Sequence, residues 1–358
     1  MIMQSHAGYA PRTKSNIRRR TQATCLRLDA STAAPWVGLQ PDNRAGHGNP
    51  VGLKSDPHHR RPWFRRAIIV MLLCLPAAVT VQAAPFTVTD DLGNTVMLAQ
   101  PARRIVSLAP HATEALFAAG LGEHVVGAVS YSNYPPEAKT IPRIGGYNNV
   151  DMERIAALAP DLVVAWHEGN RPTQLDTLRR LGLALYVSHP HTLDSVAATI
   201  ERLGRLGASA AQADAAAADY RRTLDSLRQR YAQQPPIDVF YQIWNQPLMT
   251  INDAHLIGQV LTLCGGRNVF GALGAVTPTV SEEAVLQAAP EVIVASGMGV
   301  ARPEWLDDWR RWQQLPAVRH DNLFFIPPDI LQRHGPRILE GAAQLCTQLE
   351  QARARRNP

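Results

Sequence analysis

Five aromatic side chains fall in loops directly after predicted strands: Tyr131, Tyr134, Tyr147, Trp166 and Trp244. In open α/β sheets, ligands bind outside the carboxyl ends of the strands. Broad aromatic faces with a few directed polar groups are typical of a site for a large planar ligand. The five positions together therefore predict a binding site, although one such aromatic alone is more often a packing residue.

Three charged side chains follow the last predicted strand, Asp329, Arg333 and Arg337. A carboxylate and two guanidinium groups can hydrogen-bond to the amides or carboxylates of a ligand. We expect them to supply the polar part of the same site.

Motifs of catalysis are missing from the sequence. It contains no Gly-x-Ser-x-Gly elbow, no P-loop and no Gly-x-Gly-x-x-Gly after a strand. The pair His189 and His191 has no acidic or histidine partners nearby in sequence, so a solvated loop is a better interpretation than a metal site. The sequence thus predicts no enzyme, no resident cofactor and no metal.

A repeated stretch indicates which elements position these residues. Residues 153–165 are echoed by 283–295, and in both copies a glutamate precedes a proline by seven residues. Each copy reads as a short helix, a proline stop and a buried strand. Residues 122–128 and 266–272 form a second echo in the same order. The repeat predicts two α/β lobes of related plan with parallel sheets. Chance matching of apolar runs is the alternative.

The composition changes sharply between the lobes. Residues 193–234 are rich in Ala, Leu, Arg and Gln, which favour helix. One helical face carries Tyr220, Leu224, Leu227 and Tyr231. A helix over 208–233 would span about 39 Å. Such a helix between two domains is a strut that limits closure; a surface helix of one lobe is the alternative. The predicted organisation is an N-terminal lobe (84–192), an interlobe helix (193–234) and a C-terminal lobe (235–358).

The positive charge of the chain is concentrated at its start. Residues 1–83 hold 12 of the 36 Lys/Arg but only 3 of the 30 Asp/Glu, so the remainder carries 24 positive and 27 negative groups, a net −3. A basic nucleic-acid-binding surface is therefore not indicated.

Residues 63–83, together with the arginines just before them, have the pattern of a secretory signal. The basic segment 60–66 precedes the apolar run 67–75, and small residues end at Ala83, where we predict cleavage. The apolar run is too short to span a bilayer. Residues 1–62 have no apolar period and should remain disordered. Translation starting downstream of Met1 is the favoured explanation; a cytoplasmic tail on an uncleaved anchor is the alternative.

Two cysteines remain after the signal, Cys264 and Cys346. In an exported protein an even pair favours one disulfide, and a loop of this size would be stabilised by about 4–5 kcal/mol. Two buried thiols or a metal pair are the alternatives.

Residues 88–352 resemble the solute-binding proteins of ABC importers whose two lobes are joined by a rigid helix. The resemblance is carried by residues 131–136, 151–155, 161–166, 169–170, 264–270, 336–337 and 344–346. Within that family the chain is most similar to the members that bind cobalamin.

The resemblance implies a corrin site lined by Tyr131, Tyr147 and Trp166, with Tyr147 standing where the family commonly has Trp. Asp329 and Arg333 would face the ligand from the second lobe.

One family feature is missing from the second lobe. The Trp that the family pattern places near Thr277 is absent, and Trp244 is the candidate substitute. The family's disulfide maps onto Cys264 and Cys346.

The resemblance also implies two docking glutamates, Glu153 and Glu283, each pairing with arginines on one half of a permease dimer. Glu282 leaves the second position ambiguous by one residue.

The function expected from these features is that of a monomeric periplasmic protein that carries cobalamin or a related corrinoid to an importer. A haem or ferric-siderophore binder is the alternative within the same fold, in which Arg333 and Arg337 would neutralise anionic ligand groups. An exported metal-dependent enzyme is the third hypothesis.

Overall fold

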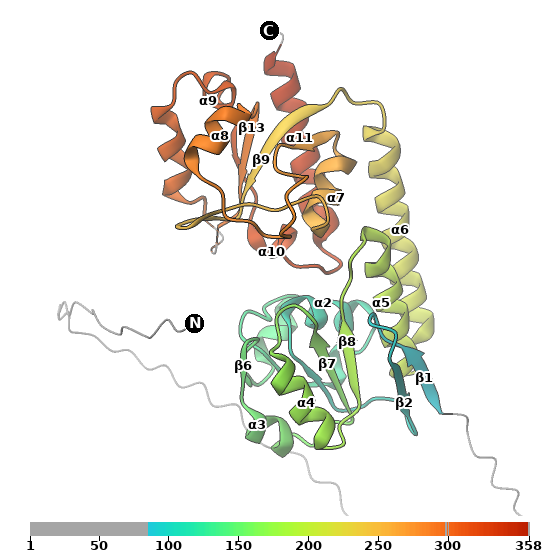
Figure 1. The fold of residues 1–358 in the computed structure, drawn as a ribbon. Helices are drawn as coiled ribbons and strands as arrows, with labels where there is room; N and C mark the ends of the chain where they lie inside the picture. Colours follow the sequence, from blue (N-terminus) through green and yellow to red (C-terminus); the bar gives the residue numbers. More distant parts are fainter. Residues whose placement is uncertain (1–84, 298, 300, 357–358) are drawn as a thin grey trace, which may run out of the picture. The chain divides into compact units, whose positions relative to one another are not determined.

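Two four-stranded parallel sheets form the cores of two lobes in the computed structural model, which describes residues 85–297, 299 and 301–356 (Figure 1). This confirms the predicted α/β class with parallel sheets. The predicted extension and signal, residues 1–83, lie outside the described residues. Within the described part of the chain, no helix has the length and apolar character needed to cross a membrane.

The sheet of the first lobe has the order β4-β3-β7-β8. Its strands are β3 (Ile105–Ser107), β4 (Val125–Ala128), β7 (Leu162–Trp166) and β8 (Leu185–Ser188). The helices of this lobe are α2 (Pro110–Ala118), α3 (Met152–Ala157) and α4 (Pro172–Arg180), with short 3-10 turns at Gly122–His124 and Pro136–Thr140.

The sheet of the second lobe has the order β12-β9-β13-β14. Its strands are β9 (Ile237–Gln242), β12 (Gly266–Asn268), β13 (Val292–Ala295) and β14 (Leu323–Phe325). The helices are α7 (Leu256–Leu263), α8 (Glu282–Ala288), α9 (Pro316–Arg319), α10 (Pro328–Leu331) and α11 (Ile338–Arg356), with the 3-10 segment η3 (Glu304–Arg311).

Three two-stranded hairpins complete the strands of the described residues. They pair β1 (Phe86–Thr89) with β2 (Thr95–Leu98), β5 (Gly145–Gly146) with β6 (Asn149–Val150), and β10 (Trp244–Asn245) with β11 (Leu248–Met249). The first of these is the hairpin that turns at Gly93, where φ is +86°.

The internal repeat of the sequence is a repeat of structure. In each copy a short helix (α3 or α8) leads through an alanine and a proline into the third strand of its sheet (β7 or β13). Ala159 and Ala289 both adopt positive φ, 42° and 46°, directly before Pro160 and Pro290. The proline disfavours a right-handed helical conformation at the preceding residue, so the helix ends there in both lobes.

Both copies of the repeat strand are buried on both faces. In β7, Leu162 and Val164 enter one core cluster while Val163 enters another, and β13 divides its residues in the same way. Alternate side chains of a strand point to opposite faces. The apolar runs of β7 and β13 are unbroken because both faces of each strand are buried in a core.

The segment predicted as one interlobe helix contains two. Helix α5 (Leu193–Leu206) ends at Gly207, and α6 (Ala210–Tyr231) begins after Ala208, whose φ is +56°. Gly207 leaves no room for a side chain, because a Cβ atom there would lie 2.1 Å from the Leu121 side chain. The chain therefore turns at 207–209 and α6 packs along α5 (Figure 1).

Together α5 and α6 belong to the cores of both lobes. Ile200 and Ala213 lie in a first-lobe cluster, whereas Val196, Tyr220 and Leu224 lie in the main second-lobe cluster. The predicted apolar face of α6 is buried accordingly. With 22 residues, α6 spans about 33 Å.

The structure joins Cys264, which caps α7, to Cys346 on α11 in a disulfide, with 4.7 Å between the two Cα atoms. Both residues are fully buried in the second-lobe core. The sequence left buried thiols and a metal pair open, and the disulfide is the alternative that the structure contains.

Candidate functional site

A cavity of about 490 Å³ lies between the two lobes. The first lobe contributes Tyr147, Trp166 and Glu168, and the second contributes Ile243, His255, Ile257, Val276, Thr277, Gln332 and His334. Trp166 ends β7 and Ile243 directly follows β9, so the cavity is reached by the carboxyl ends of central strands in both sheets. This is where open α/β sheets bind ligands.

Trp166 and Tyr147 form an aromatic pair at the cavity wall. Their ring centroids are 5.4 Å apart with a tilt of 54°, and the His111 ring meets Trp166 edge-on at 5.5 Å. Burial lowers the pKa of His111 to about 3, with Arg333 as a second cause, so His111 is a neutral packing partner. Two of the aromatics predicted from the sequence are thus brought together in the lining of the cavity.

Asn170 fixes both aromatic residues. Its side-chain oxygen accepts from the Trp166 backbone N–H at 2.7 Å, and its amide nitrogen donates to the backbone oxygens of Tyr147 (2.6 Å) and Leu108 (3.1 Å). Asn170 is almost fully buried. It is a positioning residue that the sequence did not single out as part of the site.

Tyr131 and Tyr134 do not line this cavity. Tyr131 is 73% exposed and has a φ of +66°. The Arg337 guanidinium lies 4.0 Å from the centroid of the Tyr134 ring, a cation–π contact between the lobes.

Arg333 connects the lobes. It donates to Oε1 of Glu114 (2.9 Å), to the side-chain oxygen of Asn133 (2.8 Å) and to the backbone oxygen of Tyr131 (3.0 Å), and it also pairs with Asp329 at 2.7 Å. Its side chain is only 10% exposed. Arg333 is therefore bound to other protein groups. Neither Arg333 nor Asp329 lines the cavity.

Glu114 is the buried carboxylate of this contact. Burial raises its pKa to about 7, against the opposing influence of the Arg333 and Arg337 guanidinium groups. One of its oxygens, Oε2, is buried without a hydrogen-bond partner among the described residues. The charge of Glu114 is thus stabilised mainly from the opposite lobe.

The second-lobe aromatic predicted for the site lies elsewhere. Trp244 is in the β10–β11 hairpin, and its indole N–H donates to the backbone oxygen of Gln246 at 2.9 Å. Thr277 does line the cavity. A small side chain, Thr277, thus lines the cavity near the position where the family pattern has Trp. Trp244 does not take the place of that Trp.

Two histidines of the cavity were missed by the sequence reading, His255 and His334. Their rings meet edge-on at 5.1 Å. Neither lies in a motif, and they are 79 positions apart in the sequence, so only the fold brings them together. The sequence-noted pair His189 and His191 stacks at 5.9 Å, and no group of three or more His, Cys, Asp or Glu in the described residues could hold a metal ion.

The two proposed docking glutamates occupy equivalent positions. Glu153 is the second residue of α3, whose N-cap Asp151 accepts from the backbone of Arg154. Glu283 is the second residue of α8, and its N-cap Ser281 accepts from the backbone of Ala284. Both glutamates are exposed.

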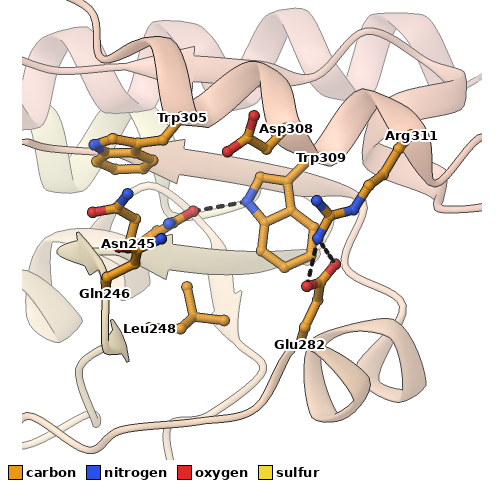
Figure 2. Close-up of a pocket in the computed structure, with 9 residues that line it drawn as sticks. Asn245, Gln246, Leu248, Glu282, Trp305, Asp308, Trp309 and Arg311 are labelled. Atoms are coloured by element: carbon orange, nitrogen blue, oxygen red, sulfur yellow. Dashed lines mark hydrogen bonds and ion pairs between the residues drawn. The ribbon is translucent and has the colours of Figure 1, made fainter.

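Glu282 differs from Glu283 because it faces a smaller pocket of about 210 Å³ within the second lobe (Figure 2). It accepts hydrogen bonds from Arg311 and from the indole N–H of Trp312. The indole N–H of Trp309, another residue of this pocket, donates to the side-chain oxygen of Gln242 at 2.8 Å. The carboxylate of Glu282 is therefore occupied by hydrogen bonds within the second lobe.

A model of the periplasmic binding protein family matches residues 105–330. The chain is 41% identical over 251 residues to the vitamin B12-binding protein of Vibrio cholerae, which covers 70% of this chain and 90% of that protein. The crystal structure of the periplasmic vitamin B12 binding protein BtuF of Vibrio cholerae matches with a TM-score of 0.66 and 40% identity, over 71% of this chain and 98% of that one. The apo periplasmic haem-binding protein RhuT from Roseiflexus matches with a TM-score of 0.64 and 25% identity, over 70% and 99%.

Proposed function

We propose that this chain, which belongs to the periplasmic binding protein family, captures cobalamin (vitamin B12) or a related corrinoid in the cavity between its lobes. The observation that carries the proposal is the pair Trp166 and Tyr147 at the cavity wall, held by Asn170. A corrin ring offers a broad face with amide groups at its rim, which suits aromatic contact with few charges. The vitamin B12-binding protein and the BtuF structure of Vibrio cholerae, to which the chain is similar, carry this ligand in their names.

As a carrier protein, the chain would bind and release the corrinoid without catalysis. The cavity is lined by aromatic, aliphatic, imidazole, hydroxyl and amide groups, and its single carboxylate, Glu168, comes from the first lobe.

A haem or ferric-siderophore ligand is the alternative, favoured by the similarity to a haem-binding structure. In that case Arg333 and Arg337 would have to neutralise anionic groups of the ligand. Both are already paired with Glu114, at 2.9 Å and 3.6 Å, and removing them from a buried carboxylate would cost several kcal/mol. This cost favours the less charged corrinoid.

Delivery to an ABC importer is the second part of the proposal. Glu153 and Glu283, one per lobe and at the same helical position, would each pair with arginines on one half of a permease dimer. Backbone hydrogen bonding at the start of α8 lowers the pKa of Glu283, which keeps it ionised. Because Glu282 is engaged by Arg311, we assign docking in the second lobe to Glu283.

The periplasm is the location of the family. Export would use the signal predicted at 63–83 with cleavage after Ala83, and the protein would act as a monomer because each lobe supplies one docking carboxylate.

The test is isothermal titration of the protein with cyanocobalamin, and in parallel with haemin and a ferric siderophore. One-to-one binding of cyanocobalamin alone is the expected result. Binding of haemin or of the iron chelate, with no heat from cyanocobalamin, would keep the fold and replace the ligand.

A further inference from the structure

The two histidines of the interlobe cavity are not equivalent. Nδ1 of His255 accepts the backbone N–H of Ile257 at 3.1 Å and thereby caps α7. The proton of its neutral ring must then sit on Nε2, which leaves no lone pair for another partner. His255 can donate a hydrogen bond into the cavity but cannot act as a ligand to a metal.

His334 differs from His255 in its hydrogen bonding. In the part of the chain that the structure describes, its ring nitrogens take part in no hydrogen bond and no ion pair. Burial lowers its pKa well below 6.5, with His255, His111 and His189 as further causes, so the imidazole is neutral at physiological pH. A neutral imidazole nitrogen is a good ligand for a transition-metal ion.

The backbone at His334 is held in place from both lobes. Arg333, directly before it, is anchored on Glu114 and Asn133 of the first lobe. Gly335, directly after it, lies so close to His111 that a Cβ atom at 335 would be 3.2 Å from the His111 Cβ. His334 therefore occupies a fixed position in the cavity lining, beside the edge of the His255 ring.

We propose that His334 coordinates the metal at the centre of the bound macrocycle, at an axial position whose resident ligand can exchange. The inference rests on the proposed function and narrows it to corrinoids such as aquocobalamin, in which water occupies the upper axial position of cobalt(III). The cobalt–water bond breaks, the water leaves, and the lone pair of an imidazole nitrogen forms the new bond. The oxidation state does not change and no proton is transferred. Cyanide is too strong a ligand to be displaced in this way, so cyanocobalamin would bind without coordination.

The experiment compares the visible absorption spectra of aquocobalamin and cyanocobalamin, each free and mixed with the protein, in mildly acidic buffer where the cobalt-bound water stays protonated. We expect the bands of aquocobalamin to shift to those of an imidazole complex, and the bands of cyanocobalamin to stay at their positions. An unshifted aquocobalamin spectrum at saturation would overturn the inference without the need for any variant.

His334→Ala should abolish this shift and weaken aquocobalamin binding by about 10-fold or more, the order seen when a metal ligand is disturbed. The variant should lose more affinity for aquocobalamin than for cyanocobalamin, because only the aquocobalamin complex loses a bond to the metal, and far-UV circular dichroism verifies its fold. His191→Ala is the matched control, because His191 is exposed and outside the cavity lining. A shift that persists in His334→Ala would refute the assignment, whereas failure of the wild type to bind either cobalamin would refute the proposed function together with it.

Discussion

Two neighbours in sequence, Gly169 and Asn170, help to orient Trp166 beside its aromatic partners Tyr147 and His111. Asn170 holds its backbone N–H, and Gly169 leaves space for its ring. A Cβ atom at position 169 would lie 1.9 Å from an atom of the Trp166 ring, so any other residue there would displace the indole. The pre-formed orientation reduces the entropy that a ligand must offset on binding.

Replacement of Trp166 by alanine should weaken cyanocobalamin binding by about 30-fold, the loss expected for an anchor contributing about 2 kcal/mol. Titration calorimetry measures the change. Trp305→Ala is the matched control, because Trp305 lines the second-lobe pocket and not the interlobe cavity (Figure 2). Equal affinity of Trp166→Ala and the control would mean that Trp166 is only a packing residue.

Glu114 should make stability depend on pH. Its pKa in the folded protein, about 7, lies above the usual 4.5, so the folded state binds the proton more tightly than the unfolded state. The free energy of unfolding therefore falls as the pH rises from about 4.5 to 7, by up to about 3 kcal/mol from this group.

Glu114→Gln should remove this dependence, as measured by urea unfolding at a series of pH values. As the pH rises from about 4.5 to 7, the unfolding free energy of the wild type should fall relative to that of the variant. A constant difference would show that Glu114 keeps an ordinary pKa.

At the scale of elements, the helix–proline–strand unit performs two tasks in each lobe. Its strand, β7 or β13, contributes to the sheet core, and its helix, α3 or α8, presents a glutamate at the second position. A carboxylate in the first turn of a helix is stabilised by the helix dipole. One local sequence pattern thus specifies both a core strand and an exposed charge.

The disulfide between α7 and α11 should stabilise the second lobe mainly by restricting the unfolded chain. For the sequence separation of 82 residues, the loop-closure term is about 4.5 kcal/mol. Replacement of both Cys264 and Cys346 by alanine should therefore lower the free energy of unfolding by about 4 kcal/mol. Urea unfolding of the oxidised wild type, the reduced wild type and the double variant measures it, and equal stability of all three would contradict the prediction.

At the scale of the whole molecule, the lobes are connected by more than the helix pair α5 and α6. Arg333 reaches from the second lobe to Glu114, Asn133 and the backbone of Tyr131 in the first. Helices that enter both cores, together with a buried ion pair across the lobes, favour a protein that binds its ligand with little closure.

Charge reversal at both proposed docking positions, Glu153→Lys with Glu283→Lys, should abolish cobalamin uptake by cells that contain the importer, while calorimetry shows unchanged affinity. The matched control is Glu137→Lys with Glu304→Lys, which places the same charge change on one exposed glutamate per lobe. Normal uptake with the docking variant, or an equal loss with the control, would refute the specific role.

Sequence alone determined the features that local physics controls. The apolar runs after Pro160 and Pro290 specified the buried strands, and the helical face of Tyr220 and Leu224 specified the amphipathic helix. The α/β class with two related lobes followed from these patterns. Trp166 was predicted for the site because it lies where a strand of a parallel sheet ends. Tyr147 lies in the turn of the antiparallel β5–β6 hairpin, so its place beside Trp166 is set by the tertiary fold.

Tertiary structure decided the features that depend on contacts between distant residues. Arg333 was expected to face the ligand, but its four acceptors come from Glu114, Tyr131, Asn133 and Asp329, and only the packing of the lobes brings the first three to it. His255 and His334 belong to no pattern, yet the fold sets their rings 5.1 Å apart in the cavity. A spacing in sequence reports which face of one element a residue occupies, whereas the partner of a side chain is set by how separate elements pack.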